Sequence, residues 1–85
     1  MRLVSQDADF DIKYENFDLV VEEDIEDGCF CIFAVSDDML YRMADYSTLE
    51  NATSVMNMMI NNYMKNLKTF YFPTDEKVTN VIREV

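Results

Sequence analysis

The first half of the chain alternates apolar with polar side chains, the pattern of half-buried β-strands. The segment DFDIKY alternates Phe10, Ile12 and Tyr14 with charged residues, and FDLVVEE repeats the pattern. The next segment, CFCIFAV at residues 29–35, is almost continuously apolar, which indicates a strand that is covered on both faces or paired with another subunit. Residues 1–46 are therefore predicted to form an antiparallel meander of four to five short strands.

Two turns are predicted within this meander. Asp27-Gly28 is a strong hairpin signal, and Gly28 is the only glycine of the chain, which indicates a backbone position with positive φ. Asp37 and Asp38 predict a second turn, before the segment MLYRMADY.

The pattern changes at residue 47, where apolar residues begin to recur every three or four positions. Ser47, with Glu50 three residues later, has the form of a capping box, so we predict a helix over residues 47–67. Its apolar stripe is expected to pack on the sheet, with Asn51 and four other asparagines on the opposite side. The stripe comprises Leu49, Ala52, Val55, Met56, Met58, Met59, Ile60, Tyr63, Met64 and Leu67, and Met58 and Met64 at its edge are candidates for an exposed patch.

The last part of the chain predicts a short strand and a terminal helix. KTFYF, before Pro73, indicates a strand in residues 68–73. In residues 74–85, Thr74 is a suitable helix cap, and Val78, Val81, Ile82 and Val85 share one helical face. Residues 1–85 are thus expected to form a single α+β domain, in which one amphipathic helix packs on a meander.

The chain is strongly acidic, and its charge is unevenly distributed along the sequence. Seven basic and 17 acidic residues give a net charge of −10, and residues 7–27 alone hold ten acidic side chains against Lys13, a local charge of −9. Such a surface repels nucleic acid and anionic lipid, so neither is an expected direct partner. The sequence contains no apolar run long enough to span a membrane, and we expect a cytoplasmic protein.

Catalytic and metal-binding motifs are sparse. The chain has no histidine, and Cys29 with Cys31 supplies only two ligands of a four-ligand zinc site. The aspartates of QDADFD are not followed by the glycine and glutamate of a calcium loop, whose places are taken by Ile12 and Asp18. We therefore expect a non-enzymatic protein without a metal or cofactor, whose two cysteines are reduced and packed.

In several of these segments the chain resembles a family of small proteins encoded by phages and prophages of Firmicutes. The shared segments are MRLVSQD at the start, D-I-x-Y-E from Asp11, YST-x-E-x-A from Tyr46, M-x-M at Met56, and F-x-F-P ending at Pro73. The resemblance implies a phage setting and supplies no catalytic residue. The chain departs from the pattern in its acidic EEDIEDG turn and in its tail after residue 75, where a specialised partner surface is expected.

These observations favour an acidic inhibitor that binds a host protein by mimicking DNA. The expected partner is a nucleic-acid-handling defence protein such as a CRISPR nuclease, whose positively charged groove attracts carboxylates spaced like phosphates. Solubility alone remains an alternative explanation of the charge. The residues expected to bind the partner are Asp18, Glu22, Glu23, Asp24, Glu26 and Asp27.

A second hypothesis is an oligomeric accessory protein. Its apolar strand and tail would bury against other copies, as a homodimer or larger assembly, and the assembly could sequester a nucleotide used as an immune signal. Arg42, flanked by Tyr41 and Tyr46, is the best candidate for contact with a phosphate.

Overall fold

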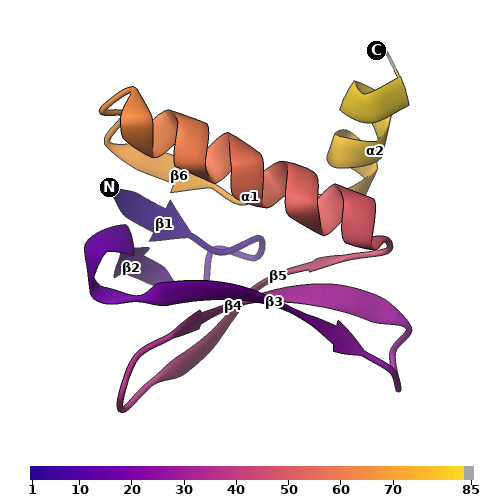
Figure 1. Ribbon diagram of the computed structural model, residues 1–85, viewed down its shortest axis with the longest axis horizontal. Helices are drawn as coiled ribbons and strands as arrows, with labels where there is room; N and C mark the ends of the chain where they lie inside the picture. The colour runs from indigo at the N-terminus through magenta and orange to yellow at the C-terminus, as the bar shows by residue number, and fades with distance from the viewer. Residues whose placement is uncertain (84–85) are drawn as a thin grey trace.

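The computed structural model describes residues 1–83 as an α+β fold with two three-stranded sheets and two helices (Figure 1). Helix α1 lies on one side of the molecule, and the sheet of β3, β4 and β5 lies on the opposite side. In chain order the elements are β1 (Arg2–Val4), β2 (Asp11–Lys13), a 3₁₀ turn (Tyr14–Asn16), β3 (Asp18–Asp24), β4 (Cys29–Val35), β5 (Leu40–Tyr46), α1 (Leu49–Met64), β6 (Thr69–Tyr71) and α2 (Asp75–Arg83).

The predicted meander is present in β3, β4 and β5, which pair antiparallel in chain order. The hairpin signal at Asp27-Gly28 is confirmed, although the loop has four residues, 25–28, rather than two. Gly28 has a φ of 66°, and its N–H donates a hydrogen bond of 2.8 Å to the carbonyl of Asp24. Glycine is favoured here because the left-handed region carries no steric penalty for it.

The first two strands do not belong to that meander, which corrects the prediction of one sheet of four to five strands. Strand β1 pairs antiparallel with β2 and parallel with β6, where Leu3 lies opposite Phe70. Apolar alternation fixes which face of a strand is buried, but it does not identify the neighbouring strand. Gln6 connects the two sheets, because its N–H donates to the carbonyl of Met43 at 2.9 Å.

Helix α1 is confirmed, with different ends. Its N-cap is Thr48, one residue after the predicted Ser47, and Thr48 Oγ1 accepts the N–H of Asn51 at 3.0 Å. The helix ends at Met64, and Asn66, with a φ of 60°, lies in the left-handed conformation common after helix ends. The core beneath α1 contains Leu3, Ile32, Ala34, Met43, Ala44, Tyr46, Ala52, Val55, Met59, Phe70, Phe72 and Val78.

Two side chains of α1 lie elsewhere than the pattern predicted. Asn51 was expected on the exposed side, but it is buried, because α2 packs beside the first turn of α1. Met58 packs partly against the core, whereas Met64 is exposed, so only one of the two candidates for an exposed patch is on the surface.

The terminal helix is also confirmed as α2. Thr74 Oγ1 accepts the N–H of Lys77 at 3.3 Å, and Val78 is fully buried against the core. Val81, the next position of the predicted apolar face, is exposed. Ile82 and Val85 lie outside the described side chains.

Candidate functional site

The strand β3 divides its side chains between two faces of the sheet. Leu19 and Val21 pack against the core, so Asp18, Glu22 and Asp24 lie on the opposite face, which we call the outer face. No other described element covers this face in Figure 1. Half of the predicted partner-binding set is thereby aligned along a single strand.

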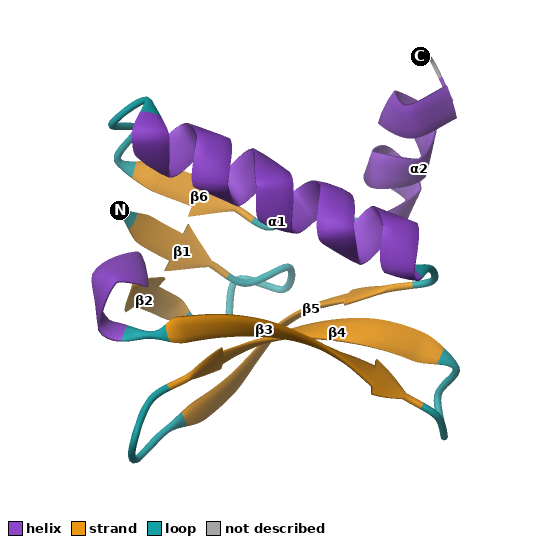
Figure 2. Cartoon of the chain, in the orientation of Figure 1, coloured by secondary structure: helices purple, strands orange, loops and turns teal. Residues whose placement is uncertain are grey.

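The other three predicted carboxylates lie around the hairpin loop. Glu26 and Asp27 belong to the loop, and Glu23 is exposed at the end of β3 on the side of the core, opposite Phe30. The loop lies at the end of the molecule opposite the N-terminus (Figure 2). A shallow hollow of about 270 Å³ there is lined by Glu22, Glu23, Asp24, Ile25, Glu26, Cys31 and Phe33. We call the segment 18–27 the acidic hairpin.

Arg42 on β5 neutralises part of this charge. Its guanidinium lies 3.4 Å from Asp24 Oδ2 and 3.8 Å from Asp27 Oδ2, and its Nε donates to Asp45 Oδ1 at 2.6 Å. The N–H of Asp27 donates to Asp24 and lowers the pKa of that carboxyl, an effect to which Arg42 adds. Asp24 therefore remains ionised, and its carboxylate accepts a hydrogen bond from the loop residue Asp27.

The remaining predicted carboxylates are available to a partner. Asp18, Glu22, Glu23 and Glu26 are exposed and form no ion pair with any described side chain. Of the predicted residues, these four present the least neutralised charge.

Ile25, which is not among the predicted partner-binding residues, lies at the tip of the acidic hairpin. Its side chain is 84% exposed, the most exposed of the large apolar side chains described. A single apolar residue inside the run EEDIEDG was the available signal, since turns are usually built from polar residues. Protein–protein interfaces commonly have an apolar centre with a polar rim around it.

The residues proposed for nucleotide contact do not converge. Strand alternation places Arg42 on the outer face, whereas Tyr41 packs against Phe10, with ring centroids 4.9 Å apart. Tyr46 is 1% exposed, and its hydroxyl donates to the carbonyl of Pro73 at 2.8 Å. Burial raises the pKa of Tyr46, so the hydroxyl stays protonated. These three residues therefore do not line a common site.

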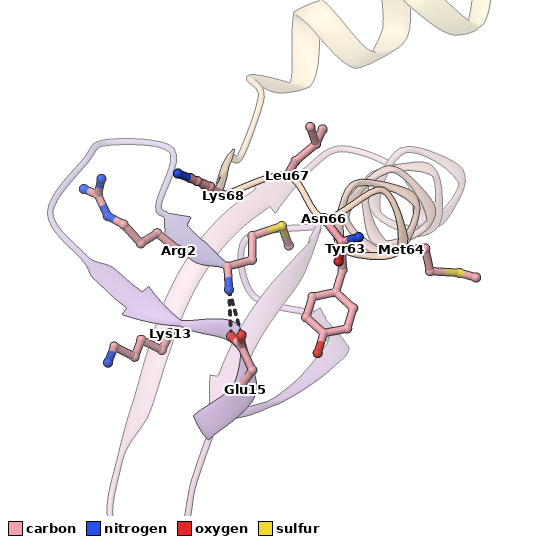
Figure 3. A pocket seen from close by; sticks show the side chains of 9 residues that line it. Arg2, Lys13, Glu15, Tyr63, Met64, Asn66, Leu67 and Lys68 are labelled. Carbon is pink, nitrogen blue, oxygen red and sulfur yellow. Dashed lines mark hydrogen bonds and ion pairs between the residues drawn. The ribbon is translucent and has the colours of Figure 1, made fainter.

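Several basic side chains lie close together at the end of the molecule opposite the acidic hairpin. Arg2, Lys13 and Lys68 border a hollow of about 650 Å³, with Tyr63 and Met64 on its other side (Figure 3). The hollow also includes the terminal amine, which binds Glu15 at 2.8 Å, and Arg2 is paired with Asp11. No local sequence pattern marks this site, because its basic residues come from β1, β2 and the segment before β6.

The two cysteines share the outer face of β4, and their Sγ atoms are 3.7 Å apart. Cys31 is buried on this face, between the strands that flank β4. Burial, together with the adjacent Asp45 carboxylate, raises the pKa of Cys31 to about 12. The Cys31 thiol is therefore protonated at neutral pH and is a weak nucleophile.

Comparisons with protein-family models, with curated proteins and with solved structures find no match to this chain. Within the described residues, neither α1 nor α2 combines the length and the hydrophobicity that a membrane crossing requires.

Proposed function

We propose that the protein is a non-enzymatic, phage-encoded inhibitor that acts in the bacterial cytoplasm. Its acidic hairpin docks in the nucleic-acid-binding cleft of a host defence protein and competes there with DNA or RNA. The phage setting rests on the sequence resemblance. The observation that supports docking most directly is the alignment of Asp18, Glu22 and Asp24 on an uncovered sheet face that leads to Ile25.

The spacing of these charges supports mimicry of a nucleic acid strand. Six residue steps separate Asp18 from Asp24, which corresponds to about 20 Å of extended chain. A DNA strand carries about six phosphate charges over that length. Four carboxylates of the predicted set, Asp18, Glu22, Glu23 and Asp24, lie on that length of β3, and Glu26 and Asp27 continue the charge into the loop. The acidic hairpin therefore approaches the charge density of a DNA strand without equalling it.

Apolar contact adds to the electrostatic one. Val20 and Phe33 lie half-buried on the outer face between the acidic positions, opposite each other in the ladder. A partner that covers the carboxylates of β3 also covers these side chains and Ile25. Buried apolar area supplies affinity, while complementary charge mainly speeds association and selects the partner. Solubility alone requires no apolar residue among the charges.

The test is charge reversal at three carboxylates that carry no structural contact. Glu22→Lys, Glu23→Lys and Glu26→Lys together should abolish capture of the target from lysate of a CRISPR-bearing Firmicute. A matched variant with Asp9→Lys, Asp37→Lys and Asp38→Lys changes the net charge equally at exposed positions outside the hairpin and should retain capture. The captured enzyme, once purified, should release the wild-type protein when its own nucleic acid is added.

Two results would contradict this proposal. Equal loss of binding in both triple variants would mean that total charge, rather than the acidic hairpin, controls the interaction. Simultaneous binding of the nucleic acid and the protein to the target would exclude mimicry.

A second candidate function is supported by the basic hollow. Arg2, Lys13 and Lys68 beside Tyr63 offer cationic and aromatic contacts to the phosphate and base of a nucleotide. If the protein sequesters a nucleotide signal, cyclic nucleotides should raise its melting temperature. Lys13→Glu with Lys68→Glu should remove that rise, and Lys77→Glu in α2 is the control because it lies outside the hollow.

A further inference from the structure

The outer face carries a cluster of metal-binding side chains next to the acidic hairpin. Cys29 and Cys31 point to this face from β4. In the ladder, Asp24 of β3 lies opposite Cys29, and Asp45 of β5 lies opposite Cys31. One carboxylate oxygen of Asp24 and the two Sγ atoms all lie within 4.8 Å of one another.

The separation of the two sulfur atoms fits a tetrahedral metal ion. Two thiolates bound to Zn²⁺ at about 2.3 Å with tetrahedral angles are about 3.8 Å apart. The Sγ atoms of Cys29 and Cys31 are 3.7 Å apart, so they require almost no movement to share an ion. We propose that Cys29, Cys31 and Asp24 bind one thiophilic divalent cation of the Zn²⁺ or Cd²⁺ class, with Asp45 as the fourth donor and with release of the two thiol protons to solvent as the ion binds.

Arg42 indicates that this cluster accommodates a cation. Its guanidinium contacts Asp24 at 3.4 Å, Asp45 at 2.6 Å and Cys29 Sγ at 3.7 Å, which are three of the four donors. A bound metal ion competes with Arg42 for these donors. The Arg42 side chain is 39% exposed and can turn into solvent when the ion binds.

The fold supplies the ligands that the sequence pattern lacked. Two cysteines alone leave a zinc site two ligands short, and a carboxylate from each flanking strand completes the set. Asp27 and the exposed Glu22, which lies opposite Cys31, add further negative charge around the cluster. Because its ligands come from three adjacent strands, the ion would fix the meander and the base of the hairpin, independently of any inhibitory role.

The experiment titrates the reduced full-length protein with Cd²⁺ and follows the cadmium–thiolate charge-transfer absorption. We expect saturation at a single ion per chain and competition by Zn²⁺. Cys29→Ser and Asp24→Asn should each weaken binding at least about tenfold. Arg42→Gln should strengthen it, because the competing cation is removed. Asp38→Asn, an exposed aspartate in the turn between β4 and β5, should bind as the wild type does.

Absence of the charge-transfer band in both the wild type and Arg42→Gln would overturn the proposal. Unchanged affinity in Asp24→Asn would overturn the assignment of Asp24 as a ligand. A second measurement uses only the wild type, so that its result does not depend on whether the variants fold. Zn²⁺ should slow the alkylation of Cys29 by iodoacetamide in the wild type, and an unchanged alkylation rate would contradict metal binding at this thiol.

Discussion

The side-chain amide of Asn51 donates a hydrogen bond of 2.8 Å to Asp75 Oδ1, which joins the first turn of α1 to the first residue of α2. The same oxygen accepts the N–H of Ser47 at 2.9 Å, and Asn51 also donates to Thr79 Oγ1 at 2.8 Å. Burial raises the pKa of Asp75, but the hydrogen bonds to its carboxylate outweigh burial and hold that pKa below its usual value. The ionised carboxylate is therefore part of the contact between the helices.

The contribution of Asp75 to stability should disappear in acid. Because its pKa is lower in the folded state, the unfolded chain takes up the proton first as the pH falls. The stabilisation is present above about pH 4 and is lost as the pH falls through the folded-state pKa. Asp75→Asn should thus lower the free energy of unfolding at about pH 7 and much less at about pH 3, as measured by urea denaturation.

Asp38→Asn is the matched control for that comparison, since Asp38 is exposed in the turn between β4 and β5. Its effect on stability should be small under both conditions. If Asp75→Asn lowers the free energy of unfolding equally at both values of pH, the charge of Asp75 does not contribute to stability.

Two methionines of the same helix should respond very differently to truncation. Met59 is 1% exposed and Met64 is 75% exposed. Met59→Ala should lower the free energy of unfolding by about 2–5 kcal/mol, because it leaves a cavity in the core. Met64→Ala should change it by less than about 0.5 kcal/mol. Urea denaturation measures both, and similar values for the two variants would contradict the placement of α1.

The elements that the sequence predicts well are those specified by neighbouring residues. The hairpin loop that ends at Gly28 follows from local conformational preference, and α1 follows from its apolar period. The outer-face position of Asp18 and Glu22 follows from the period of two in β3. Part of the candidate site could therefore be located from the sequence.

The features that the sequence did not predict depend on contacts between distant segments. The parallel pairing of β1 with β6 joins residues 2–4 to residues 69–71, which are far apart in the sequence, and no local pattern specifies it. The polarity of Asn51 predicts an exposed position on the helix, yet α2 supplies the partners that permit its burial. The proximity of Asp24 to Cys29 likewise follows from the strand register, which only the fold defines.

Gly28 should resist replacement by alanine for reasons of backbone conformation alone. Its φ is 66°, and a Cβ atom built there would meet nothing within 4 Å. Gly28→Ala should therefore lower the free energy of unfolding by about 1–2 kcal/mol, the cost of a left-handed alanine, without any steric clash. Gly28→Asn should cost less, because asparagine tolerates this region. Urea denaturation that gives no loss for the alanine variant would contradict the loop conformation.

Ile25 should contribute to partner binding without contributing to stability. Because its side chain is 84% exposed, Ile25→Ser should leave the melting temperature unchanged. If Ile25 inserts into the partner, the same change should weaken binding of the captured target at least about tenfold. Leu40→Ser is the matched control, since Leu40 is also exposed but begins β5 at the other end of the sheet.

Binding measured at low and at high salt distinguishes the apolar contact of Ile25 from the contacts made by the carboxylates. Ile25→Ser changes no charge, so its effect on the dissociation constant should be the same factor at low and at high salt. Reversal of Glu22, Glu23 and Glu26 should instead reduce the salt dependence of binding, because the screened attraction is removed. Wild-type affinity in Ile25→Ser, alongside loss of binding in the reversal variant, would mean that the hairpin binds through charge alone.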